Sequence, residues 1–373
     1  MPSLYIHIPF CKKACHYCSF YFTLSTAQKD KFIQTLCKEI QTRKSEFEGQ
    51  KIDSIYFGGG TPTMLSIHDF ELIFSTINEN YTIEAKAEIS LESNPENLSE
   101  TYLRGLKNLG FNRLSIGVQS FFDEDLELMN RNHKALDAEI AIQKATNFFE
   151  NVSIDLMFGL PFSGMNRWQK NLKKAVELNV KHISTYNLTI EEKTALARKI
   201  KRNELAVEED STLNKMYFFT LDFMSKNGFT NYEISNFGKE NYWSKHNIGY
   251  WKNEKYIGFG PSAHSYDGEE RRWNISNLNN YLTLVEKGDT YWGKELLSTE
   301  NKYNEYILTS LRTIFGVDIL EIKTNFGEKY SQYFEENVLK YINEENIINE
   351  KNRYTLTPSG KVIADAISSD LMM

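Results

Sequence analysis

Three of the four cysteines of this 373-residue chain stand close together, as Cys11, Cys15 and Cys18. Thiolates at such spacing can hold a metal centre. A structural zinc site is closed by four ligands, whereas an iron–sulfur cubane uses one ligand for each iron. Three thiolates would therefore leave one iron of a cubane open, and a small molecule could bind and react there. This vacancy predicts a reactive metal centre near the start of the chain.

A zinc site with three cysteines and one histidine is the alternative at this point. Its fourth ligand would be His7 or His16. His16 lies inside the cysteine loop, where the thiolates leave it little room to turn inward, and His7 can pack or hydrogen-bond on a predicted strand before the loop. The fourth cysteine, Cys37, falls beside the apolar face of a predicted helix, which suits a core residue.

The first half of the chain predicts strands that alternate with helices. Apolar runs that end in turn residues predict strands at 4–9, 52–57, 86–92, 113–118, 152–158 and 182–188. Helical periodicity predicts helices at about 28–43, 66–79, 99–109, 123–130, 135–149 and 167–178. The alternation predicts an α/β fold, in which right-handed crossovers curl a parallel sheet into a partial or full β/α barrel.

Candidate binding residues follow several of these strands. The segment Gly58–Pro62 comes after the second predicted strand, and its consecutive N–H groups could bind a carboxylate. Glu92, Gln119 and Asp155 fall at or near the ends of the next three strands. Because a barrel brings the carboxyl ends of its strands to one opening, we expect these side chains to converge there. Together they could hydrogen-bond a charged amino acid and a ribose.

Two further parts follow the predicted barrel, which we place at residues 1–230. Residues 231–296 are rich in aromatic side chains and too irregular for another βα unit, so we predict a cover segment over the barrel mouth. Residues 297–373 predict three helices and a β-wing, as in a winged-helix module. Because residues 328–350 are acidic, internal packing or partner docking suits this module better than nucleic-acid binding.

The composition narrows the class of protein. The formal net charge is −7 and no basic tail is present, which argues against a nucleic-acid partner. The first residues lack the basic leader and the cleavage site of a signal peptide, and no apolar run approaches the roughly 20 residues of a membrane span. We therefore expect a cytoplasmic protein, whose thiols stay reduced and can bind metal.

The cysteine spacing resembles that of the radical S-adenosylmethionine (radical SAM) superfamily. The pattern Cys-x3-Cys-x2-Cys follows a first strand and has an aromatic residue, Tyr17, before the last cysteine. This resemblance implies that Cys11, Cys15 and Cys18 hold a [4Fe-4S] cluster, whose fourth iron is chelated by the amino and carboxylate groups of SAM. In that superfamily an electron from the cluster cleaves SAM to a 5′-deoxyadenosyl radical, while the protein binds, orients and excludes water.

The likeness is closer to one family, the coproporphyrinogen III dehydrogenase-like proteins. It is carried by the segments Tyr5–Cys11, Gly58–Pro62, Leu114–Phe121 and Ile154–Pro161, and it covers essentially the whole chain. The resemblance implies that a set of residues lines SAM sites: Tyr5, Tyr17, Gly59, Gly60, Thr61, Glu92, Gln119, Arg131 and Asp155.

Two branches of this family differ at the cysteine loop. The dehydrogenase, which decarboxylates propionate groups of a tetrapyrrole, typically has a fourth cysteine two residues after the third and an N-terminal arm before the first strand. Phe20 occupies that position here, and only ten residues precede Cys11. Both departures resemble the heme chaperone branch, HemW.

That branch is also marked by the pattern HNxxYW, which stands here at residues 246–251. The resemblance implies a heme site with His246 as axial iron ligand and with Tyr250 and Trp251 as walls, because imidazole binds heme iron and aromatic faces pack on a porphyrin. His264 is the second candidate ligand, although its glycine-rich segment fits a plain turn equally well.

The sequence therefore predicts a heme chaperone that binds heme and transfers it to an apo-hemoprotein, with a [4Fe-4S] cluster and SAM as cofactors. The first alternative is the coproporphyrinogen III dehydrogenase itself, and the second is a zinc protein. A third is another radical SAM enzyme, such as a methyltransferase that acts on tetrapyrroles or RNA. Whether the chain forms a homodimer, and whether it turns over any substrate, stays open.

Overall fold

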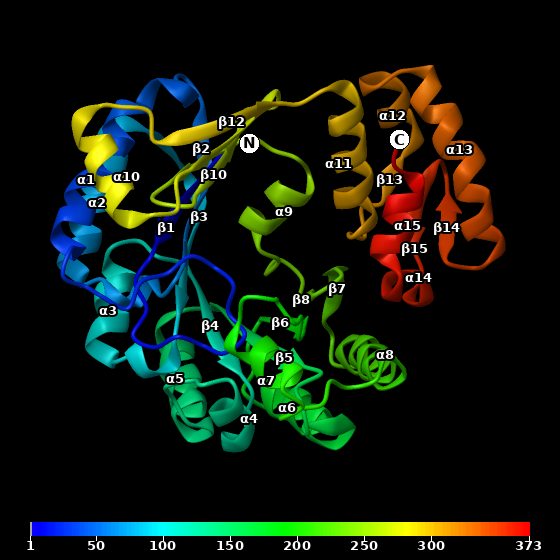
Figure 1. Cartoon of the computed structure of the whole chain (residues 1–373), viewed down its shortest axis with the longest axis horizontal. Helices are drawn as coiled ribbons and strands as arrows, with labels where there is room; N and C mark the ends of the chain where they lie inside the picture. Colours follow the sequence, from blue (N-terminus) through cyan, green and yellow to red (C-terminus); the bar gives the residue numbers. More distant parts are fainter. Residues whose placement is uncertain (1) are drawn as a thin grey trace.

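A curved sheet of twelve strands is the framework of the computed structural model, which describes residues 2–373 (Figure 1). The strands in its middle are parallel and lie in chain order: β1 Ser3–Ile8, β2 Lys51–Gly59, β3 Thr82–Ser93, β4 Arg113–Gln119, β5 Asn151–Phe158 and β6 His182–Asn187. The outermost strands of the sheet do not pair with each other. The predicted α/β fold is confirmed, and its barrel is partial.

Helices from the βα units cover the outer face of this sheet (Figure 1). They are α1 Lys29–Thr42, α2 Ile67–Asn80, α3 Glu100–Asn108, α4 Asp123–Leu128, α5 Ala135–Phe148, α6 Gly164–Glu177 and α8 Asp210–Lys226. Short 3-10 turns precede or follow some of them: η1 Lys44–Phe47, η2 Pro62–Met64 and η3 Pro95–Asn97. The helix α2 shows why these α-helices form. Ser66 and Asp69 make a reciprocal capping box at its start, and the buried Phe70, Ile73 and Ile77 recur at helical spacing.

Residues 231–296 are more regular than the sequence predicted, because they extend the sheet at both edges. Strands β7 Thr230–Glu233 and β8 Asn236–Gly238 join it beside β6. Strands β9 Tyr256–Phe259, β10 His264–Tyr266, β11 Glu270–Asn274 and β12 Trp292–Leu296 join it beside β1. These strands are too short to give a clear alternating pattern. The helix α9 Lys245–Trp251 lies on the inner side, between β2 and the C-terminal helices (Figure 1).

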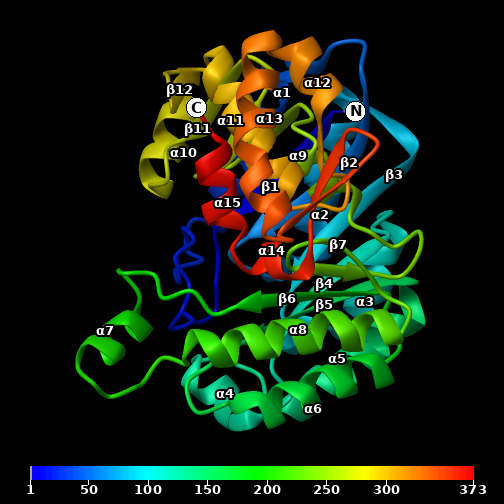
Figure 2. The same ribbon diagram turned by 90° about the vertical axis from the view of Figure 1, so that its right-hand side faces the viewer.

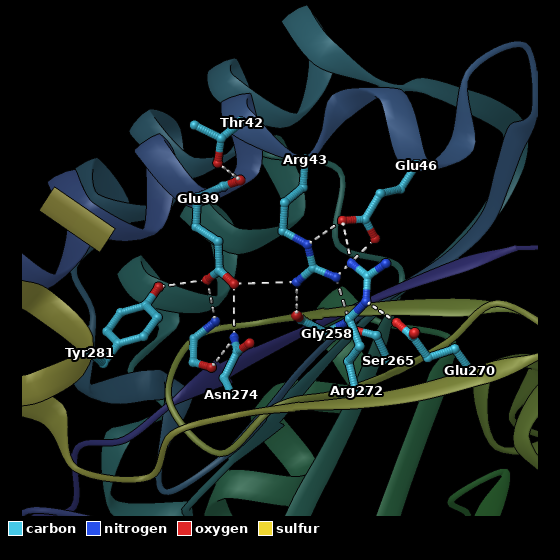
Figure 3. Close-up of polar contacts among 11 residues, drawn as sticks. Glu39, Thr42, Arg43, Glu46, Gly258, Ser265, Glu270, Arg272, Asn274 and Tyr281 are labelled. Carbon is cyan, nitrogen blue, oxygen red and sulfur yellow. Dashed lines mark hydrogen bonds and ion pairs between the residues drawn. The ribbon is translucent and has the colours of Figure 1, made fainter. Parts of the chain in front are cut away.

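A buried polar network joins α1 to the added strands (Figure 3). The Glu39 carboxylate, fully buried, accepts hydrogen bonds from Tyr281 Oη at 2.6 Å and from Asn274 Nδ2 at 2.8 Å. It also accepts a hydrogen bond from the Gly260 N–H at 2.8 Å and forms an ion pair with Arg43 at 3.3 Å. Tyr281 belongs to α10 Leu278–Lys287, which packs on α1. One carboxylate therefore fixes the position of β9, β11 and α10.

The C-terminal residues form a second layered unit with its own core. Helices α11 Thr299–Leu311, α12 Ile319–Asn325, α13 Glu328–Asn343, α14 Pro358–Val362 and α15 Ala364–Leu371 surround a small sheet of β13 Val317–Asp318, β15 Arg353–Leu356 and β14 Ile347–Glu350 (Figure 2). Its core includes Tyr303, Ile307 and Phe334, apart from the core of the large sheet. The division of the chain at residues 230 and 296 stays a prediction. Within residues 2–373, no helix has the length and apolar character needed to cross a membrane.

Candidate functional site

The cysteine loop follows β1 and is held against two other segments. The Cys11 N–H donates to Thr23 O, and Asn130 Nδ2 donates to Ala14 O at 2.7 Å. His16 Nδ1 bonds Leu128 O at 2.8 Å, so this ring nitrogen is directed to the backbone at the C-terminal end of α4. Figure 2 shows the helix α7 Ala195–Lys201 projecting beside the loop, where the Leu196 N–H donates to His16 O. The loop is therefore fixed from both sides.

The thiols of this loop are free and influence one another. Burial, with the nearby Cys18 and Cys15, raises the pKa of Cys11 to about 11, against the lowering effect of Thr61 and Arg131. Thr61 Oγ1 donates to Cys11 Sγ at 3.5 Å, and Arg131 Nη1 approaches Cys15 Sγ at 3.4 Å. Thiolates in this loop thus need added positive charge, which a bound metal centre would supply.

Two glycines let the backbone after β2 approach the loop closely. Gly59 has φ +108, and a Cβ there would lie 2.6 Å from the His7 ring. A Cβ on Gly60 would lie 2.8 Å from Phe10 O and 3.1 Å from Cys11 Sγ. A side chain at Gly60 would push the cysteine loop away, and one at Gly59 would collide with His7 on β1. Gly60 therefore stands directly against Cys11, and Gly59 stands against the strand that leads into the loop.

Glu92 lies at the end of β3 inside the barrel. Tyr56 Oη donates to its Oε1 at 2.8 Å, and the Gly59 N–H donates to its Oε2 at 3.1 Å. Burial, with the nearby charge of Asp155, raises the pKa of Glu92 to about 7, against the lowering effect of these donors. A carboxyl group with this pKa can accept or donate a proton near neutral pH.

Two other predicted residues lie on the neighbouring strands, Gln119 at the end of β4 and Asp155 inside β5 rather than at its end. Gln119 ends β4 with φ 67, a left-handed conformation that is strained for glutamine, and its side chain is buried. Asp155, on β5, accepts a hydrogen bond from Ser115 Oγ at 3.3 Å. Burial raises the pKa of Asp155, although Ser184 and Arg113 oppose this effect. The charge of Asp155 adds to the rise in the pKa of Glu92 and in that of Tyr17, so these predicted residues share one polar interior.

Arg131 connects this interior to the cysteine loop. Besides Cys15, its guanidinium contacts Tyr17 Oη at 3.5 Å, Asn94 Oδ1 at 2.6 Å and Gly117 O at 2.7 Å. Asn94 Nδ2 in turn donates to Thr61 Oγ1 at 3.2 Å. A relay of hydrogen bonds therefore runs from Arg131 through Asn94 and Thr61 to Cys11.

A cavity of about 600 Å³ opens beside this site, between the large sheet and α11. Its walls are largely aromatic and include Tyr5, Phe20, Tyr250, Trp251, His264 and Arg271. Tyr5 also hydrogen-bonds His7 Nδ1 through its hydroxyl group at 3.1 Å. Tyr5, predicted to contact SAM, thus faces the cavity as well as the region of Gly58.

His246 lies behind the wall of this cavity. It is 1% exposed, and its Nδ1 and Nε2 bond Ser54 Oγ and Tyr250 Oη, each at 2.9 Å. Burial and the nearby Arg113 charge lower the pKa of His246 to about 3, so the imidazole is neutral. Tyr250 and Trp251 line the cavity, whereas His246 reaches it only through Tyr250.

Comparison with known proteins agrees with these features. Residues 5–175 match the Radical SAM superfamily profile, and residues 297–363 match the HemN C-terminal domain. The chain is 36% identical to the heme chaperone HemW of Bacillus subtilis, with 98% of each chain covered. It is 32% identical to the heme chaperone HemW of Lactococcus lactis, covering 96% of this chain and 94% of that protein.

The chain belongs to the HemW family of the radical SAM superfamily. Among solved structures, it resembles coproporphyrinogen III oxidase (HemN) from Escherichia coli, a radical SAM enzyme, with a TM-score of 0.87 and 26% identity over 100% of this chain and 90% of that one. The HemW family and HemN thus share the radical SAM fold.

The donor set fits the [4Fe-4S] cluster and SAM that radical SAM membership implies. Each iron of a cubane takes its own thiolate, so the three sulfur atoms need not converge on one point. In the part of the chain that the structure describes, no three His, Cys, Asp or Glu side chains stand close enough to hold a single metal ion. Arg131, Thr61 and Gly60 lie against the thiols, and Glu92 lies beyond them, bonded to the Gly59 N–H.

Two residues of this HemW-family site were not predicted from the sequence. Asn94 joins Arg131 to Thr61, and Tyr56 orients Glu92. In the sequence, Tyr56 falls within a predicted strand and Asn94 falls just after one. Their places at two neighbouring parallel strands, close to polar residues already predicted for the site, were the available signal.

Proposed function

We propose that this chain is a heme chaperone, which binds heme and transfers it to an acceptor hemoprotein. Its relatives in Bacillus subtilis and Lactococcus lactis carry the name heme chaperone. One observation carries the proposal. Phe20, at the position where the dehydrogenase branch has a fourth cysteine, lines the same cavity as Tyr250 and Trp251 of the HNxxYW pattern.

The cavity has the chemistry that a porphyrin requires. Its volume of about 600 Å³ lies within the range of roughly 300–1,000 Å³ that is typical of small-molecule sites. Tyr5, Tyr250 and Trp251 offer aromatic faces to a planar macrocycle. Arg271 is the only Arg or Lys side chain among residues 2–373 that lines it, and it could pair with a propionate carboxylate.

The cysteine site lies beside this cavity. Cys11, Cys15 and Cys18 would hold the [4Fe-4S] cluster, which as in other radical SAM proteins supplies an electron to bound SAM. Gly59, Gly60, Glu92 and Arg131, with Tyr17, Thr61, Gln119 and Asp155, would bind and orient SAM. Arg131 offsets thiolate charge, and Glu92 can hold a proton near neutral pH. We further propose that the cluster and SAM gate heme transfer or dimerisation, in the cytoplasm.

A transfer assay tests the chaperone function. The anaerobically purified protein, loaded with hemin, is mixed with an apo-hemoprotein that binds heme without a covalent bond. We expect the holo-protein to form and the chaperone to lose its heme spectrum. If heme leaves the protein no faster or more completely for an acceptor than for an excess of serum albumin, the chaperone function is wrong.

A second function, the anaerobic coproporphyrinogen III dehydrogenase, is favoured by the likeness to HemN over the whole chain. The same preparation is incubated with reductant, SAM and coproporphyrinogen III. The chaperone proposal predicts no protoporphyrinogen and no carbon dioxide. Their formation in amounts exceeding the enzyme would establish the dehydrogenase instead.

A further inference from the structure

Four groups of side chains in or behind the cavity could reach heme iron: His7, His246, His264 and the tyrosines. An axial nitrogen ligand must be a neutral imidazole with an unoccupied nitrogen that faces the porphyrin. The proposed heme function therefore raises the question of which of these groups has such an atom.

Two of the histidines already use both ring nitrogens. His246 bonds Ser54 and Tyr250, and His7 bonds Tyr5 Oη through Nδ1 and Tyr21 O through Nε2 at 3.2 Å. A neutral imidazole has one donor and one acceptor, so neither ring has a nitrogen to spare. Both rings are also buried, at 1% and 5% exposure. Either would have to break a buried hydrogen bond and turn before it could bind iron.

The cavity tyrosines are also poor candidates. A phenol binds ferric iron well only after it loses its proton. Burial raises the pKa of Tyr250, Tyr256 and Tyr266, so these hydroxyl groups stay protonated near neutral pH. They supply aromatic walls rather than a metal ligand.

His264 differs from all of these. Its side chain is exposed on β10 and lines the cavity, and within residues 2–373 no hydrogen bond to its ring is formed. The ring lies beside Trp273, with the centroids 6.4 Å apart. Partial burial at the cavity wall and the Arg271 charge lower the pKa of His264, which keeps the imidazole neutral.

The glycine-rich segment before His264 holds this histidine in place. A Cβ on Gly258 would lie 2.1 Å from His264 O, and a Cβ on Gly260, which has φ +94, would lie 2.5 Å from His7 O. These glycines let β9 lie against β10 and β1 at close range. The segment is therefore a close-packed part of the sheet, and it presents His264 at the cavity wall.

We propose that His264 is the axial ligand of the heme iron, and that His246 is a positioning residue that orients Tyr250. This assignment rests on the proposed heme-binding function, and it replaces His246 as the iron ligand. Arg271, whose Nη1 now pairs with Glu305 at 2.8 Å, stands near His264 and would face a propionate of the same heme.

Hemin titration of full-length, cluster-containing variants tests this assignment. Difference spectra against hemin-free protein remove the absorption of the cluster, and electron paramagnetic resonance reports the axial ligand. His264→Ala should weaken hemin binding by at least about tenfold and remove the ligand signature, because the loss of a direct ligand costs no less than the loss of its supporting contacts. Added imidazole should restore the signature in this variant.

Two matched variants separate ligation from structural support. His68→Ala changes an exposed histidine on α2, 74% exposed, and should leave the spectrum unchanged. Tyr250→Phe removes only the hydroxyl group that bonds His246, and should weaken binding without changing the signature.

Each outcome has one meaning. If hemin binds to wild type but His264→Ala keeps the wild-type affinity and signature, His264 is not the ligand, while heme binding by the chain stands. If the signature is lost in His246→Gln and kept in His264→Ala, the original assignment of His246 is right. If wild type gives no hemin spectrum, the proposed function itself fails.

Discussion

At the scale of single residues, Glu92 has the clearest link between environment and chemistry. It is a buried carboxyl group that receives hydrogen bonds from Tyr56 and from the Gly59 backbone, next to Gly60 at the cysteine loop. The effect of burial is nevertheless larger than that of these two donors, and it raises the pKa of Glu92 from the ordinary value of 4.5 to about 7. Glu92 is thus a proton-holding group in a site that would bind a charged sulfonium cofactor.

This raised pKa predicts a pH dependence of stability. Between about pH 4.5 and 7 the native protein keeps a proton that the unfolded chain has released, so the free energy of unfolding falls as pH rises. The full loss would be about 3 kcal/mol. Glu92→Gln should make the fall smaller by this amount, measured by urea unfolding of metal-free protein across this range. Glu48→Gln, at an exposed site, should behave as wild type. Equal slopes in wild type and Glu92→Gln would show that Glu92 ionises normally.

The four cysteines should separate into two classes. Cys11→Ser, Cys15→Ser and Cys18→Ser should each lose the iron–sulfur cluster, because each thiolate would hold a different iron. Cys37→Ser should keep it, since Cys37 lies on α1 with its thiol directed to Leu72 O. Iron and sulfide analysis after anaerobic purification should give about four of each per chain for wild type and Cys37→Ser. One zinc without sulfide would instead support a zinc protein.

At the scale of elements, the strands after residue 230 support the cavity. The wall that carries His264 and Arg271 belongs to β10 and β11, which reach the barrel only through β9 and β1. The Glu39 network in Figure 3 clamps these strands onto α1. A carboxylate far from the cysteines therefore helps to shape the proposed heme site.

Removal of this carboxylate should be costly. Glu39→Ala removes a negative charge that pairs with the buried Arg43. It also leaves the hydrogen-bond donors of Asn274, Tyr281 and Gly260 without their acceptor. We expect the free energy of unfolding to fall by about 3–5 kcal/mol in chemical denaturation. Glu48→Ala, shortly after the same helix and exposed, is the matched control and should change stability little. A Glu39→Ala variant as stable as this control would contradict the role of the network.

The same elements show what a sequence can predict. The parallel strands and their helices were predictable because long apolar runs, helical spacing and glycine turns repeat, so Gly59, Glu92 and Gln119 could be placed at strand ends. The environment of His246 was not predictable, because its partner Ser54 lies 192 residues away in the sequence. A motif shows which residues are present, but contacts between segments far apart in the sequence decide which side chain faces a cavity.

At the scale of the whole molecule, the cavity lies between two separate cores. The large sheet supplies Arg271 and the C-terminal unit supplies Glu305, and these two side chains form an ion pair across the boundary. Lys361, on α14, also crosses it and donates to Asn231 Oδ1 on β7, the strand at the edge of the large sheet. The docking of the C-terminal unit thus completes the proposed heme site.

Lys361 predicts how this docking responds to pH. Burial lowers the pKa of Lys361 from 10.5 to about 8. From about pH 8 to 10.5 the unfolded chain binds the extra proton, so stability should rise with pH across that window. Lys361→Met should raise the thermal midpoint at pH 7 and remove this rise, whereas Lys329→Met, exposed on α13, should do neither. A Lys361→Met variant that is less stable at pH 7 would show that the bond to Asn231 outweighs burial.

An equilibrium hemin titration of the anaerobically purified wild-type protein shows whether this chain binds heme beside a cysteine-held cluster. We expect a saturable heme spectrum at about one heme per chain, with the iron and sulfide of the cluster retained. Hemin association that never saturates, or that displaces the cluster, would contradict it.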